Sequence, residues 1–93
     1  MLDIFYLSDI GNNKKPIFSI GDKELQVFDD AFEYLHKATG VFIDPYATTY
    51  VYVSHQKLLV NYLNNSKDTA TLKFILFLQQ AIKENETLLF DGD

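Results

Sequence analysis

The sequence lacks cysteine and arginine, and it contains no long apolar run. Without cysteine, neither a disulfide framework nor a thiolate metal site can form. The most hydrophobic stretch, FILFL, has five residues, whereas a membrane-spanning helix needs about 20. The acidic start MLDIFYLSDIG also lacks the basic region of a secretory signal. These absences predict a cytoplasmic protein that has no membrane partner.

The absence of arginine leaves lysine as the only basic residue, with eight lysines against thirteen acids and a net charge of −5. Arginine is the side chain that most often recognises phosphate and guanine. An acidic chain without arginine is therefore a poor candidate for direct binding to nucleic acid. It suits a basic protein partner better, because opposite charge speeds encounter and rejects wrong partners.

Enough apolar residues are present to build one domain over residues 1–93: 47% are hydrophobic, including eight Phe and six Tyr. Residues 2–7 and 17–20 predict two strands joined in a hairpin, and residues 87–90 predict a third strand. Residues 41–43 are expected to be a strand or extended, and residues 48–53 are expected to be extended. We expect an α+β fold in two layers, with a small sheet of two to four strands from both chain ends packed against three helices.

The three helices are predicted from apolar periodicity and from capping residues. The first covers residues 23–38, with Asp22 as N-cap and Gly40 as C-cap. Val27, Ala31, Tyr34 and Ala38 are expected to widen its apolar face to half of the circumference. The second covers residues 55–64 after Ser54, and the third, predicted to be the most buried, covers residues 69–85 after Ser66 or Asp68.

Catalytic and metal-binding patterns are weak. Ser54 and His55 are neighbours at a helix start and do not face each other. Glu33 and His36 have the i, i+3 spacing of carboxylate-bridged metal sites, but no second helix repeats the motif. No glycine-rich phosphate loop is present. The sequence thus predicts no catalytic residue, no metal and no cofactor.

Acidic residues concentrate in two stretches. Residues 22–33 contain five acids and one lysine, and residues 84–93 contain four acids and no lysine. Charge on a small domain can serve solubility alone, but an acidic helix face and an acidic chain end also favour a basic partner. The predicted partner-binding residues are Asp22, Asp29, Asp30, Glu33, Asp44, Tyr46, Asp91 and Asp93.

Tyrosines would strengthen such a surface if they were exposed, because tyrosine is enriched at interface hot spots. The candidates for exposure are Tyr46, which follows the Asp44-Pro45 break, and Tyr50 or Tyr52, which occupy alternate positions of the next extended segment. Core packing is the alternative role for each of these rings.

The runs FIDPYATTYVYVSHQKLLVNYL and FLQQAIKENETLLFDGD together resemble small bacterial immunity proteins that are encoded beside polymorphic or contact-dependent toxins. The resemblance covers about half of the chain, from Val41 to the end. It implies that the chain binds and neutralises a cognate basic toxin domain, often a nuclease, as in contact-dependent growth inhibition. In many members a glycine or similar residue follows D-P-Y. Ala47 stands there in this chain, so its bend is expected to differ. The residues that fit the pattern are Asp44, Pro45, Tyr46, Thr48 or Thr49, and Ser54.

Two other functions remain open from the residues. The chain could be an accessory or homodimerisation module with exposed aromatic or apolar surface, in which Leu76 and Phe77 of the third helix face solvent. It could also be a small enzyme in which His36 or His55 lies beside a carboxylate of raised pKa in a cleft. A monomer or a weak homodimer is expected.

Overall fold

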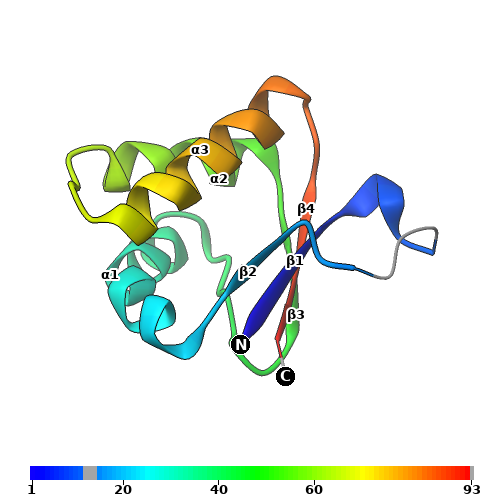
Figure 1. Cartoon of the computed structure of the whole chain (residues 1–93), viewed down its shortest axis with the longest axis horizontal. Helices are drawn as coiled ribbons and strands as arrows, with labels where there is room; N and C mark the ends of the chain where they lie inside the picture. Colours follow the sequence, from blue (N-terminus) through cyan, green and yellow to red (C-terminus); the bar gives the residue numbers. More distant parts are fainter. Residues whose placement is uncertain (12–14, 93) are drawn as a thin grey trace.

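The computed structural model describes residues 1–11 and 15–92 and has the two-layer α+β architecture that the sequence predicts (Figure 1). Three helices lie on one face of the sheet. The strands are β1 (Leu2–Tyr6), β2 (Phe18–Ile20), β3 (Thr48–Val51) and β4 (Leu88–Gly92). The helices are α1 (Asp22–Thr39), α2 (Val53–Leu63) and α3 (Thr69–Lys83), with a 3-10 turn η1 (Leu7–Asp9) after β1.

The four strands pair antiparallel in the order β2-β1-β4-β3. The predicted β1–β2 hairpin is therefore present, and the two chain ends meet because β1 and β4 are neighbours at the centre of the sheet. Segment 48–51 adds an edge strand beside β4, whereas residues 41–43 form no strand. Leu2 and Ile4 alternate toward the helices with Asp3 on the opposite face.

The core lies between the sheet and the three helices and is rich in phenylalanine. Phe28 of α1 and Phe74 of α3 stack with ring centroids 4.7 Å apart. Phe32 meets the rings of Phe74 and Phe90 edge-on. Such ring pairs contribute about 0.5–1.5 kcal/mol each beyond their buried area. They join α1, α3 and β4 into one hydrophobic core.

Helix α1 differs from the prediction at its start and in the width of its buried face. Gly21 is the N-cap residue, and Asp22 is the first helical residue, with its Oδ1 atom 2.9 Å from the N-terminal amine. Gly40 is the predicted C-cap and has a left-handed φ of 83°, which glycine adopts without steric cost. Of the four residues expected to widen the apolar face, Ala31 is buried, as expected. The expectation was wrong for the other three, which are exposed: Val27, Tyr34 and Ala38.

Helix α2 begins two residues earlier than predicted, and Ser54 is not its N-cap. Tyr52 is the N-cap residue, and its backbone N–H donates to Nδ1 of His55 at 3.2 Å. One turn in, the fully buried Gln56 donates from Nε2 to the backbone carbonyls of Val51 and Glu86, both at 2.9 Å. Gln56 thus joins α2 to both the end of β3 and the approach to β4.

Helix α3 is capped by Asp68, whose Oδ2 accepts the backbone N–H of Thr71 at 3.1 Å, as predicted. It buries more residues than α1 or α2 does. Leu76 is exposed, as the homodimerisation alternative requires, with 66% of its surface accessible. The expectation that Phe77 also faces solvent was wrong, because Phe77 is partly buried and its ring stacks on the Phe18 ring, with centroids 4.7 Å apart.

Candidate functional site

A cavity of about 370 Å³ lies between α1 and the segment that follows it. Its lining combines an apolar floor, a carboxylate rim and a wall from the bend after α1. The floor residues are Leu2, Leu25, Phe32 and Ile43; the carboxylates are Asp29, Glu33 and Asp44; and the remaining wall residues are Phe42, Pro45 and Tyr46.

A second hollow of about 350 Å³ continues from the first and adds Met1 and Asp22 to the lining. Both hollows are lined by Leu25, Pro45 and Tyr46. We call the two hollows together the acidic groove. It brings together five of the eight predicted partner-binding residues, namely Asp22, Asp29, Glu33, Asp44 and Tyr46.

The α1 wall of the groove follows from helical spacing. Residues three, four, seven or eight positions apart share one side of a helix, which places Leu25, Asp29, Phe32 and Glu33 along the same side. Glu33 lies 3.8 Å from the Lys37 Nζ atom, in an exposed pair that holds the carboxylate only weakly. The Asp29 carboxylate has no hydrogen bond or ion pair with any other residue that the structure describes.

The opposite wall is the Asp44-Pro45-Tyr46 bend, which the sequence left open between a structural and a partner-facing role. Asp44 Oδ1 accepts the Tyr46 backbone N–H at 2.8 Å, and the Asp44 carbonyl accepts the Ala47 N–H at 3.2 Å. The Asp44 side chain therefore closes the turn as an Asx turn. This turn directs Tyr46 toward solvent, where the residue is 80% exposed.

The bend is seated on the last residue of β4. The Gly92 N–H donates to the Ala47 carbonyl at 2.9 Å. A Cβ atom on Gly92 would overlap the carbonyl group of Pro45, so glycine is required by close backbone contact and not by a positive φ. The D-P-Y bend and Gly92 at the end of β4, which lie far apart in the sequence, are thus in direct backbone contact.

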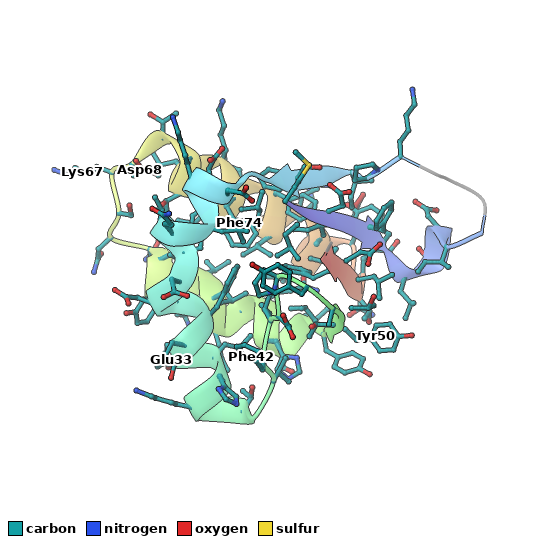
Figure 2. The ribbon with its side chains drawn as sticks, turned by 90° about the horizontal axis from the view of Figure 1, so that it is seen from below. Glu33, Phe42, Tyr50, Lys67, Asp68 and Phe74 are labelled. Atoms are coloured by element: carbon teal, nitrogen blue, oxygen red, sulfur yellow. The ribbon has the colours of Figure 1, made fainter. Side chains whose placement is uncertain are left out.

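An exposed phenylalanine adds a second ring to the groove wall. Phe42 is 51% exposed, and its ring lies 5.2 Å from the His36 ring, measured between centroids. Figure 2 shows Glu33 on α1 and Phe42 on the segment that follows it. Two aromatic rings, those of Phe42 and Tyr46, therefore flank the carboxylates of the groove.

The structure places the other three predicted residues elsewhere. Asp30 does not line the groove. It lines a neighbouring hollow that shares Glu33 with the groove and includes Tyr34 and Tyr62, whose rings stack at 4.9 Å. Asp91 lies on the face of the sheet away from the helices. Asp93 lies outside the described residues.

Sequence reasoning missed Asp3, which lies directly opposite Asp91 on adjacent strands. Asp3 Oδ1 accepts the Ser19 hydroxyl at 2.9 Å, and Asp91 Oδ1 accepts the Thr48 hydroxyl at 3.1 Å. Like charges directly opposite each other destabilise a sheet. The alternation of Leu2 and Ile4 indicates that Asp3 points outward, but only the strand register reveals its neighbour.

Three titratable side chains outside the groove make structural contacts. His36 packs on Phe42, and His55 accepts the N-cap N–H of α2. Burial and a 2.8 Å hydrogen bond to Glu84 raise the pKa of Tyr6 to about 12. Among residues 1–11 and 15–92, no three His, Cys, Asp or Glu side chains are grouped so that they could hold a metal ion.

No helix in the described part of the chain is both long and apolar enough to cross a membrane. Comparisons with known proteins found no matching family model, no similar curated protein and no similar solved structure.

Proposed function

We propose that this chain is a non-catalytic inhibitory binding protein: an immunity protein that neutralises a cognate basic toxin domain, such as a nuclease, through the acidic groove. The observation that supports the proposal most is the convergence of predicted residues. Asp22, Asp29, Glu33, Asp44 and Tyr46 come from two separate parts of the chain and line one groove. The immunity role itself derives from the resemblance of residues 41–93, and the groove supplies a physical means of binding.

The groove has the composition of a protein-binding surface. Protein interfaces combine an apolar centre with a polar rim, and tyrosine and other aromatic residues are enriched at their centres. Here an apolar floor is rimmed by carboxylates, and Tyr46 projects beside it. The chain as a whole carries a charge of −5, so a basic partner would be attracted before contact.

The groove is also rigid enough to bind without extensive ordering. One wall is an 18-residue helix, and the other is held by the Asx turn and by the contact of Gly92 with Pro45 and Ala47. Preformed walls reduce the entropy lost on association. An inhibitor that fills a basic site and excludes its substrate needs no catalytic group of its own.

The experiment is to recover partners with the tagged chain from its native cell, identify them by mass, and measure affinities of charge variants. We expect a basic toxin domain, and we expect Asp29→Lys with Glu33→Lys to raise Kd at least about tenfold, mainly through a slower association rate. Asp30→Lys with Asp91→Lys changes the net charge equally outside the groove and is the matched control. Equal loss in both double variants would refute the groove as the site. Recovery of no basic partner would refute the inhibitory role.

Homodimerisation is a second candidate function, because Leu72 and Leu76 lie one turn apart on α3 and are both exposed. An apolar pair of this kind can form a self-complementary patch. Sedimentation equilibrium would test it: a dimer that persists at high salt and dissociates in Leu76→Glu supports this candidate. A wild-type chain that stays monomeric at high concentration contradicts it.

A further inference from the structure

We infer that the acidic groove is an anchor site for one arginine side chain of the partner protein. The inference rests on the proposed function and deepens it, because it names the chemical group that the groove would hold. It derives from three properties of the groove and one of the chain. The groove has an apolar floor, exposed aromatic rings and carboxylates that retain free acceptor capacity beside the Asp22 and Glu33 ion pairs. The chain itself contains no arginine.

The floor fits the aliphatic part of a long basic side chain. Arginine and lysine bury their methylene stems along apolar surface while the charged head stays at a polar edge. Leu25, Phe32 and Ile43 provide that surface inside a cavity of about 370 Å³. A short acidic or neutral polar side chain would leave the floor in contact with water and would gain nothing from the carboxylates above it.

The carboxylates have capacity for a cation. The Asp29 carboxylate makes no hydrogen bond or ion pair with another described residue. Glu33 has only the exposed contact with Lys37 at 3.8 Å. Asp44 uses Oδ1 for the Tyr46 N–H, so its second oxygen, which accepts no hydrogen bond from a described residue, can accept one from a ligand. A guanidinium with five N–H donors can satisfy oxygens on both walls together.

The aromatic rings favour guanidinium over ammonium. Phe42 is half exposed and Tyr46 is 80% exposed, and both line the same cavity as the carboxylates. A planar guanidinium stacks on aromatic faces and is less strongly hydrated than an ammonium, so it loses less on leaving water. Carboxylates beside exposed rings are therefore the surroundings that arginine fits best.

The arginine must come from another protein. This chain has no arginine, so a second copy cannot supply a guanidinium to the groove. A basic partner domain can, because arginine is enriched at interface hot spots. The groove thus favours binding to a different protein over self-association.

The test uses N-acetyl-arginine N-methylamide as the probe, titrated into the ¹⁵N-labelled full chain and followed by amide chemical shifts. We expect saturable shifts around Asp29, Glu33 and residues 42–46 with a Kd of about 1–10 mM, the range for a fragment of this size. The citrulline analogue has the same shape without the charge, and we expect it to bind at least about tenfold more weakly. The lysine analogue should also bind more weakly than arginine.

Asparagine variants supply the site control without disturbing the walls. Asp29→Asn and Asp44→Asn remove one charge each, and asparagine can keep the Asx turn at position 44. Each should weaken arginine binding at least about threefold, whereas Asp30→Asn should leave it unchanged. Any of four results would overturn the inference. Two concern the probes: citrulline binds as tightly as arginine, or lysine does. The other two concern the site: Asp30→Asn weakens binding as much as the groove variants do, or the amide shifts lie only outside the groove.

The outcomes separate this inference from the proposed function. Groove shifts with arginine but no basic partner from the cell would support the anchor site and refute the inhibitory role. A basic partner whose affinity depends on Asp29, together with equal binding of arginine and citrulline, would overturn the anchor site and leave the proposed function intact.

Discussion

Replacement of Gly92 by alanine would test how the groove wall is held. The new Cβ would overlap the Pro45 carbonyl, so either the end of β4 or the Asp44–Tyr46 bend must move. Overpacking of this kind costs about 1–3 kcal/mol. Loss of the Gly92 N–H bond to the Ala47 carbonyl adds about 0.5–1.5 kcal/mol, and the reduced entropy of the unfolded chain returns about 0.4–1 kcal/mol. We expect a net destabilisation of about 0.5–4 kcal/mol.

The assay is urea unfolding, with the midpoint and slope compared between variants. Gly21→Ala is the matched control, because a Cβ there meets only the flexible end of Glu24. Its loss of N-cap preference and its gain in unfolded-state entropy should nearly cancel. The amide signals of Asp44 and Tyr46 should also move in Gly92→Ala and stay in place in Gly21→Ala. A Gly92→Ala variant as stable as wild type, with unshifted bend signals, would refute the proposed seating of the bend on β4.

Three further perturbations test contacts outside the groove. Gln56→Leu should lower the free energy of unfolding by about 1–3 kcal/mol, because it leaves two backbone carbonyls without their donor; urea unfolding equal to wild type would contradict this. One phenol should ionise near pH 12 in an ultraviolet titration, be absent in Tyr6→Phe and shift downward in Glu84→Gln. Because the folded-state pKa of this phenol is raised, its contribution to stability is complete below about pH 10 and is lost as the pH rises through about 12. Asp3→Asn should raise the free energy of unfolding by about 0.2–1 kcal/mol at low salt and by less at high salt, because it relieves the repulsion with Asp91; a salt-independent loss of stability would contradict that explanation.

Local sequence patterns predicted most of the elements because their causes are local. The hairpin of β1 and β2, the body of α1, the Gly40 C-cap and the Asp68 N-cap each depend on residues a few positions apart. The N-cap of α2 was missed because Ser54 has the preferred residue type, whereas the observed cap uses the His55 ring. The helix starts directly after β3 ends, and the end of β3 is set by its pairing with β4, which is a tertiary constraint.

The candidate site shows the same division. Composition and spacing marked Asp29 and Glu33 as one acidic helix face, and the break after Asp44 marked Tyr46 as a candidate for exposure. Neither pattern could join the helix face to the bend, because these segments are separated in the chain and become adjacent only by packing. Local helix geometry, by contrast, explains why Asp30, one residue from Asp29, lies outside the groove: a helix turns each successive residue by about 100°.

The sequence by itself determined the acidic and arginine-free character of this protein, its α+β composition and the presence of a turn at Asp44-Pro45, because these follow from residue types and short-range preferences. Only the tertiary structure decided that the turn rests on Gly92, that Asp3 faces Asp91 across two strands, and that four carboxylates surround an apolar floor. The physical reason is that pairing register and close packing join residues far apart in the chain, and no local preference encodes those distances.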